Sequence, residues 1–294
     1  MQQPVTKNKL KAIQMLDAVE HFIAGQRTAL QHREDLSQQV NEGVKVHGRS
    51  WKPLYELFEP MGLLPIEAGC NGIKHDSSYD ISKIAVGRVD FYLPIMKRIA
   101  GAISDRRTGG VEFSRSEYKH PEDWNQLRNL FRNMQKASVV VIDDLGERIS
   151  ISPEPKYRDF LDGAWAERGM VYLIDKTIKS FSVDHKLSSS IFWNVKLADK
   201  SPWNVTKMEL DIVAKVGKRF YVFEVKTGAL LPIDKWFDRW QLFKEAGVKY
   251  IQCTVKAIDH KLFLPLTLFP IANVEELLRR QLEKDFTTTS SCQR

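Results

Sequence analysis

The 294-residue sequence has little of what several classes of protein need. Its three cysteines, Cys70, Cys253 and Cys292, form an odd and scattered set, which argues against a disulfide framework or a zinc site and favours a reducing, cytoplasmic setting. The seven histidines include no HxH or HxxxH pair, so a histidine-ligated metal enzyme is not expected. The longest apolar stretch, Leu262–Ala272, is short and holds two prolines, so no membrane span is expected. Residues Met1–Leu10 are polar and lack the apolar segment of a secretory signal.

Glycine-rich phosphate-binding loops are missing as well. No strand–glycine–helix unit of the dinucleotide-binding type occurs in the first third of the chain. What is present is a globular composition, with 43% hydrophobic and 28% charged residues and a net charge of +7. The positive charge favours a polyanionic partner, most simply nucleic acid, without requiring one.

The most informative stretch is Lys207–Gly228, which reads KMELDIVAKVGKRFYVFEVKTG. Its Gly217-Lys218 pair is typical of a two-residue type II′ turn, which predicts a tight β-hairpin. Because side chains alternate along a strand, one face of the hairpin carries the charged residues and the other is apolar. The apolar face, which we expect to line a core, consists of Leu210, Ile212, Ala214, Val216, Tyr221, Phe223 and Val225.

With the turn in that place, Asp211 is predicted to lie opposite Glu224, and Glu209 opposite Lys226. Two directly opposed carboxylates repel each other, and a divalent cation, Mg²⁺ or Mn²⁺, bound between them would remove that repulsion. Lys226 points to the same side, where it can polarise a water molecule or steady a phosphate. The alternative interpretation is a solvated strand face on which Glu209 and Lys226 form an ordinary cross-strand ion pair.

The order of the predicted elements places this hairpin inside a larger unit. Apolar periodicity and turn residues predict helices over 9–32, 50–59, 81–102, 120–137, 157–181, 232–246 and 273–282. Strands are predicted over 139–142, 149–151, 191–197 and 250–255, with an extended piece over 260–269. The segment Ser152–Lys156, which contains two prolines, is the best candidate for a domain boundary.

The C-terminal half thus runs α–β–β–β–α–β–(β)–α, an order that resembles the core of the PD-(D/E)XK nuclease superfamily. Asp211 matches the isolated aspartate of that motif, and Glu224-Val225-Lys226 matches its ExK signature. The resemblance implies an α/β fold with a restriction-endonuclease-like αβββαβ core, a mixed sheet flanked by helices. It also implies that Asp211, Glu224 and the Val225 carbonyl hold Mg²⁺ or Mn²⁺, and that Lys226 assists phosphodiester hydrolysis.

Three segments carry a closer resemblance: FLDGAWAE at Phe160–Glu167, NVTKMELDIV at Asn204–Val213 and FEVKTG at Phe223–Gly228. They resemble the nuclease half of the CRISPR-associated CARF-domain nucleases, ancillary effectors that cyclic oligoadenylates activate to cut DNA or RNA. On the matching position, Glu167 would join the active site, and Glu209 is a further candidate metal ligand. A CARF sensor domain is not recognisable in the N-terminal part. The resemblance covers Trp124–Lys284, where the Trp124 helix and the hairpin after it resemble the family's connecting segment.

Four regions are therefore expected. Residues 1–118 form a mainly helical region that is regulatory, binds nucleic acid or mediates oligomerisation, and residues 119–154 form a connector helix and β-hairpin. Residues 155–286 form the nuclease domain, and residues 287–294 form a flexible tail. The expected partners are nucleic acid (DNA more than RNA), a second copy of the chain in a homodimer or higher oligomer, and a cyclic-nucleotide activator or protein partner acting through the N-terminal region.

Basic residues cluster at Lys97-Arg98 and Arg106-Arg107, where they would contact phosphates or form the solvated surface of a basic protein. Thr227 would either hydrogen-bond a phosphate or simply end its strand. The function that these observations favour is a metal-dependent endonuclease in defence against foreign nucleic acid. Two alternatives stay open: an endonuclease of DNA recombination or transposition, and a non-catalytic nucleic-acid-binding or assembly protein that keeps the nuclease fold.

Overall fold

The computed structural model describes residues 49–70, 77–104, 110–199, 206–228, 233–255 and 267–287. The chain divides into two compact units, Met1–Glu59 and Pro60–Arg294. The described part of the first unit is η1 (Arg49–Trp51) followed by α2 (Lys52–Phe58), whose large apolar side chains are buried. This helix confirms the one predicted over 50–59. The helix predicted over 9–32 and the predicted flexible tail beyond residue 287 lie outside the described residues.

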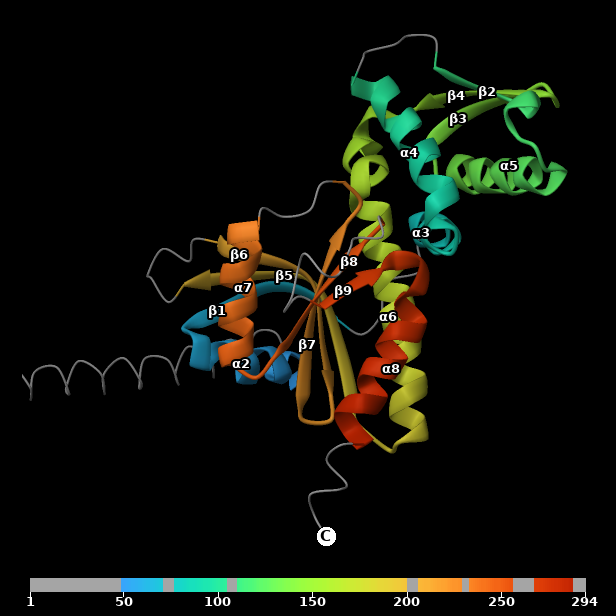
Figure 1. Cartoon of the computed structure of the whole chain (residues 1–294). Helices are drawn as coiled ribbons and strands as arrows, with labels where there is room; N and C mark the ends of the chain where they lie inside the picture. The colour runs from blue at the N-terminus through green and yellow to red at the C-terminus, as the bar shows by residue number, and fades with distance from the viewer. Residues whose placement is uncertain are drawn as a thin grey trace, which may run out of the picture. The chain divides into compact units, whose positions relative to one another are not determined.

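The second unit contains a six-stranded mixed sheet in the order β1-β5-β6-β7-β8-β9 (Figure 1). Neighbouring strands are antiparallel from β1 to β7 and parallel from β7 to β9. The strands are β1 (Leu63–Cys70), β5 (Ser189–Asp199), β6 (Thr206–Val216), β7 (Arg219–Lys226), β8 (Lys249–Thr254) and β9 (Thr267–Pro270).

Helices cover both faces of this sheet (Figure 1). Helices α6 (Trp165–Asp184) and α8 (Val274–Thr287) lie side by side on one face, and α7 (Ile233–Glu245) packs on the other face over β8. The chain order α6-β5-β6-β7-α7-β8-β9-α8 is the order that the sequence predicts. The restriction-endonuclease-like αβββαβ core is therefore confirmed.

The β6–β7 hairpin has the predicted register. Its pairs run from Ile212–Phe223 to Val216–Arg219, and the positive φ of 56° falls on the first loop residue, Gly217, and not on the second, as in a type II′ turn. The predicted core face is buried along its whole length, because each of its seven apolar residues is at most 3% exposed. A slip of one residue would bring charged residues such as Asp211 and Lys215 into this core face, so burial holds the register.

A second, three-stranded sheet packs with α5 (Pro121–Lys136) in the same unit. Its strands are antiparallel in the order β2-β4-β3, with β2 (Val111–Ser114), β3 (Val140–Asp144) and β4 (Arg148–Pro153). These elements confirm the predicted connector helix and hairpin, and they add β2 from the region expected to be mainly helical. The predicted boundaries between the regions stay predictions.

Two features of residues 60–104 differ from the mainly helical expectation. Strand β1 pairs with β5 at the edge of the large sheet; Pro65 and Gly69 interrupt its apolar pattern, and an edge strand tolerates both. The single helix predicted over 81–102 is in fact two helices, α3 (Ser77–Val86) and α4 (Val89–Ser104), which separate at Gly87. Glycine is a poor helix former, and the break there has this local cause.

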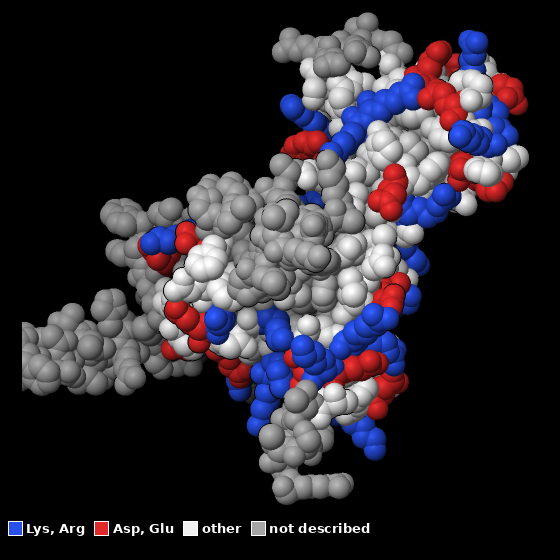
Figure 2. All heavy atoms as spheres, in the orientation of Figure 1, with Lys and Arg blue, Asp and Glu red and all other residues white. Residues whose placement is uncertain are grey.

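The described surface carries charges of both signs close together. Figure 2 shows Lys and Arg side chains beside Asp and Glu side chains at both ends of the visible face. Ion pairs account for part of this mixing, among them Arg128–Asp144 at 2.7 Å and Lys176–Glu275 at 2.8 Å. Within the described ranges, no helix is both long and apolar enough to cross a membrane.

Candidate active site

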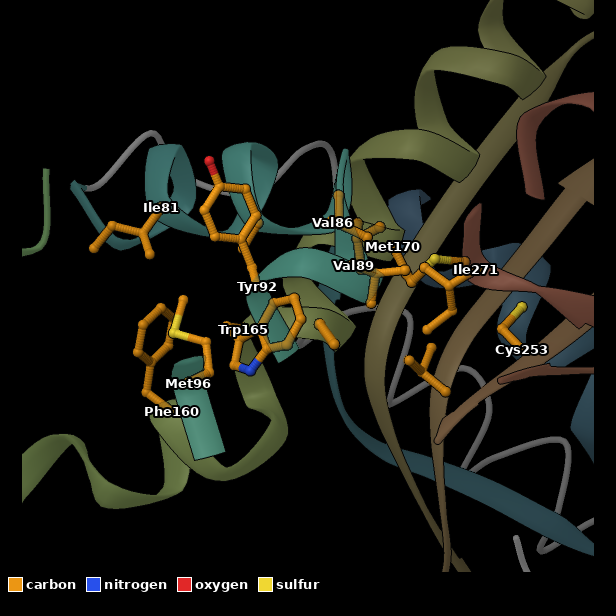
Figure 3. Packing of buried hydrophobic residues seen from close by; sticks show 14 of the residues in the cluster. Ile81, Val86, Val89, Tyr92, Met96, Phe160, Trp165, Met170, Cys253 and Ile271 are labelled. Atoms are coloured by element: carbon orange, nitrogen blue, oxygen red, sulfur yellow. The ribbon is translucent and has the colours of Figure 1, made fainter. Parts of the chain in front are cut away.

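The helix that carries Glu167 begins in an unusual way. The FLDGA segment forms a π-helix, η5 (Phe160–Ala164), directly before α6, where ordinary helix is predicted; such turns often occur at functional sites. Trp165 is fully buried and lies beside Phe160 and Met96 (Figure 3). Residues two apart on a helix point about 200° away from each other. Anchoring Trp165 in this apolar cluster therefore turns Glu167 to the opposite side of α6.

The same π-helix approaches the end of β7. A Cβ atom on Gly163 would lie 3.4 Å from the Thr227 Oγ1 atom, in van der Waals contact with it. Because Thr227 directly follows the last residue of β7, the FLDGAWAE and FEVKTG motifs meet here. Of the two roles expected for Thr227, the end of the strand is confirmed, and a phosphate contact stays a prediction.

Asp211 lies where the sheet opens. The β6–β7 ladder ends at Ile212–Phe223, one step short of the predicted Asp211–Glu224 pair. On the other side of β6, the β5–β6 ladder has pairs before and after Asp211 but none at Asp211 itself. The β5 residue between those flanking pairs, Asn194, has a φ of 50°, a left-handed conformation that interrupts a strand. Asp211 Oδ2 instead accepts a hydrogen bond from the Val225 main-chain N–H at 2.6 Å. The opening thus lets the Asp211 carboxylate bind the neighbouring backbone.

Glu224 is held by two cationic side chains. Its own side chain is only 5% exposed, with Oε1 lying 2.8 Å from Lys226 Nζ and Oε2 lying 3.0 Å from Arg239 Nη1. Arg239 comes from α7, and its guanidinium also interacts with the Tyr250 hydroxyl. The sequence motif identifies Glu224 and Lys226 but not Arg239, because one arginine on an amphipathic helix leaves no signal in a pattern of spacing.

The carboxylates of the site interact electrostatically. Burial, followed by repulsion from Glu224 and Glu167, raises the pKa of Asp211 to about 7. Burial also raises the pKa of Glu167; Lys226 opposes this shift, and Glu224 and Glu209 add to it. Burial acts to lower the pKa of Lys226, but the Glu224, Asp211 and Glu167 carboxylates outweigh it and raise that pKa. These mutual effects place the predicted catalytic residues within electrostatic reach of one another.

Glu209 is placed at the rim of this site. It is exposed and pairs across to Lys196 of β5, whereas Lys226 Nζ contacts Glu224. The ion pair expected between Glu209 and Lys226 is therefore not the contact that Lys226 makes. Glu209 does lie within electrostatic reach, since it contributes to the raised pKa of Glu167 after burial and Glu224.

The donor set suits a hard divalent cation, although its atoms are not gathered as ligands. Among the described residues, no group of three or more His, Cys, Asp or Glu side chains is arranged to hold a metal ion. Carboxylate oxygens are the ligands that Mg²⁺ and Mn²⁺ prefer, and a bound cation would relieve the repulsion acting on Asp211. Both Glu224 oxygens face cationic side chains. Glu224 would therefore have to exchange at least one of these contacts to become a ligand.

The predicted basic cluster is only partly described. Lys97 and Arg98 lie exposed on α4, whereas Arg106 and Arg107 lie outside the described residues. Arg98 is already engaged by nearby residues, because its Nη1 lies 2.7 Å from Glu117 Oε2 and its guanidinium lies over the Phe113 ring. A phosphate contact from this cluster stays a prediction.

Comparison of the chain with protein-family models and with curated proteins gives no match. Solved structures do match. Protein VC1899 from Vibrio cholerae has a TM-score of 0.50 and 16% sequence identity, over 77% of this chain and 59% of that one. Can2 from Sulfobacillus thermosulfidooxidans, solved in complex with cyclic tetra-adenylate, has a TM-score of 0.46 and 13% identity, over 75% of this chain and 56% of that one. The chain thus spans less than two thirds of each protein, and the likeness to VC1899 is one of fold.

Proposed function

We propose that the protein is a metal-dependent endonuclease that hydrolyses phosphodiester bonds of nucleic acid, DNA in preference to RNA, in defence against foreign nucleic acid. The observation that carries the proposal is the meeting of Asp211, Glu224, Lys226 and Glu167 in one site of a restriction-endonuclease-like core. Glu167 comes from α6, well before the β6–β7 hairpin that carries the other three, and their charges act on one another. Titratable groups that perturb each other's pKa in this way are typical of catalytic sites.

Each residue has a distinct part in this proposal. Asp211, Glu224 and the Val225 carbonyl would hold Mg²⁺ or Mn²⁺, with Glu167 and Glu209 completing the set or serving a second ion. Such a cation, once bound, polarises the scissile phosphate and lowers the pKa of the attacking water. Lys226 remains charged at neutral pH because of its raised pKa, so it can orient that water or stabilise the negative charge that develops on the phosphate.

Sites outside the core would select the substrate and control the timing of cleavage. The chemistry of the core needs only a phosphodiester and a cation, so it carries little selectivity of its own. We propose that the basic residues Lys97, Arg98, Arg106 and Arg107, together with Thr227, contact nucleic acid phosphates. A cyclic-nucleotide activator or protein partner would act through the N-terminal region, and the protein would work as a homodimer or higher oligomer.

The test is direct cleavage by the purified full chain. Labelled single- and double-stranded DNA and RNA are incubated with Mn²⁺ or Mg²⁺, with excess chelator, and with and without cyclic oligoadenylates. The expected result is cation-dependent cutting that Glu224→Gln abolishes. Nonspecific cutting under the control of a small nucleotide would favour the CRISPR-like defence role, and sequence-specific duplex cleavage would favour recombination or restriction. Equal cutting in excess chelator would rule out the proposed site.

One observation favours a second candidate, a nucleic-acid-binding or assembly protein without catalysis. Glu224 is neutralised by Lys226 and Arg239, as a structural carboxylate would be, and the described residues do not form a gathered metal site. In that case nucleic acid would bind with the same affinity in chelator and in Mn²⁺. If nucleic acid binds in this way and every substrate stays uncut under all the conditions above, the second candidate replaces the first.

A further inference from the structure

A buried glutamine lies beside the proposed catalytic glutamate without a hydrogen-bond partner for its amide nitrogen. Gln252 of β8 pairs with Glu224 of β7 in the parallel ladder, and its residue is only 2% exposed. Its Nε2 atom is fully buried and has no hydrogen-bond partner anywhere in the described chain. Buried polar groups are nearly always hydrogen-bonded in folded proteins, so an orphaned donor beside a candidate site requires an explanation.

The Gln252 side chain leaves the sheet on the side of the proposed site. Its neighbours Ile251 and Cys253 belong to the hydrophobic cluster that includes α6, so Gln252 must point to the opposite face, because strand side chains alternate. Tyr250, two residues earlier on that same face, stacks on Phe243 of α7 with ring centroids 5.3 Å apart. Gln252 therefore faces α7, the helix whose Arg239 holds Glu224.

Gln252 and Glu224 are also close enough to interact. Paired residues on neighbouring strands are about 5 Å apart and project their side chains to the same face. In the metal-free arrangement Lys226 and Arg239 already contact the two Glu224 oxygens. The Gln252 amide nitrogen therefore has no acceptor there. If a cation takes one of those oxygens and Arg239 withdraws, the Gln252 N–H on the paired position of β8 is an uncharged donor that can hold the other.

We propose that Gln252 is a positioning residue, whose carboxamide donates to Glu224 once a divalent cation has replaced a cationic side chain on that glutamate. This inference rests on the proposed function. An amide is suited to the role because it orients a carboxylate without competing with the cation for charge. Hydrogen-bonding groups behind a metal ligand fix its orientation, and losing one costs about 10- to 100-fold in metal affinity.

The proposal predicts that removing the amide affects the metal-bound protein and not the metal-free protein. The variant is Gln252→Met, which keeps the length of the side chain and removes its donor, with Gln252→Leu as a second variant. The matched control is Gln241→Met, since Gln241 lies exposed on α7 and donates to Glu245 at 3.1 Å. Two quantities are measured: the urea midpoint of the full chain in chelator, and the Mn²⁺ dissociation constant by calorimetry without nucleic acid.

We expect the Gln252 variants to unfold at the wild-type midpoint or a higher one, because the lost donor has no partner in the metal-free protein. Their Mn²⁺ dissociation constant should rise about 10- to 100-fold, while Gln241→Met leaves both quantities unchanged. Wild-type affinity in both Gln252 variants, or a lowered midpoint in both, would overturn this inference alone. Absence of any Mn²⁺ binding by the wild-type protein would instead overturn the proposed function, and this inference with it.

Discussion

A buried carboxylate lies at each end of strand β7, and the two have different hydrogen-bond and ion-pair partners. At the hairpin end, Asp285 of α8 accepts hydrogen bonds from the Tyr221 hydroxyl at 3.0 Å and from Gln281 at 2.9 Å, and it forms ion pairs with Lys249 and Arg219. That one carboxylate therefore has two cations and two neutral donors. Its negative charge is fully compensated, as expected of a group whose role is to hold α8 to the sheet.

At the other end of β7, the balance is reversed. Asp211, Glu224 and Glu167 share one half-buried lysine, Lys226, and one arginine, Arg239. Loss of hydration, followed by their mutual repulsion, raises the pKa values of Asp211 and Glu167. Folding would not select this arrangement for stability, because like charges gathered around the buried Glu224 repel one another. The comparison teaches that a carboxylate beside this strand is structural where its partners are complete, and suits a functional role where they are in deficit.

The largest expected effect comes from Asp211→Asn. This variant should lose cleavage by roughly 10³-fold or more, since it removes a proposed cation ligand. Its stability without metal should equal or exceed that of the wild type, because the repulsion from Glu224 and Glu167 is relieved. Single-turnover cleavage in Mn²⁺ and urea unfolding in chelator measure the two quantities. Wild-type cleavage by the variant would show that Asp211 belongs to the structural class.

Asp285→Ala should have the opposite signature. Removing this carboxylate leaves Tyr221 and Gln281 without their acceptor and breaks two ion pairs, so unfolding should become easier by about 2–4 kcal/mol. Cleavage per folded molecule should stay at the wild-type rate under conditions where the variant is folded. The control is Asp285→Asn, which keeps an acceptor for Tyr221 and should cost less. A cleavage defect without a stability loss would contradict the distinction between the two ends of β7.

The pH dependence of stability should reveal the site in the metal-free protein. In the folded chain Asp211 has a pKa of about 7, against about 3.9 when unfolded, so between pH 4 and 7 the folded state holds a proton that the unfolded state has lost. Stability must therefore fall as pH rises through this window. We expect wild type to lose about 1–2 kcal/mol more than Asp211→Asn between pH 5 and 7. Urea midpoints in chelator check this, and parallel curves for the two proteins would refute it.

The smallest effect is expected for Arg239→Gln, which removes one of the two cations that hold Glu224. The variant should reach half-maximal cleavage at a Mn²⁺ concentration about three- to tenfold lower, because a competitor for Glu224 is gone. Arg239→Lys keeps the charge and should keep the wild-type Mn²⁺ response. An unchanged Mn²⁺ response in Arg239→Gln would mean that Arg239 does not compete with the cation.

The sequence by itself determined the parts of this protein that depend on local pattern. The Gly217 turn and the alternation of Leu210, Ile212 and Ala214 with charged residues decide the hairpin register, because any other register buries the charges. The ExK motif then places Glu224 and Lys226 at one end of β7, and the order of helices and strands gives the core. Glu167 could be predicted only through a resemblance, since a single glutamate on a helix has no pattern of its own.

Tertiary structure alone decided which of these groups meet and which partners complete them. Strand β1 could not be predicted from the sequence, because an edge strand needs no regular apolar pattern. The opening of the sheet at Asp211 depends on Asn194, which lies across from it in a left-handed conformation. Arg239 reaches Glu224 from α7, and Gln252 lies beside it on β8. Nothing in their local sequence distinguishes them, because the free energy of a buried charge or amide depends on the partners that the whole fold brings within hydrogen-bonding distance.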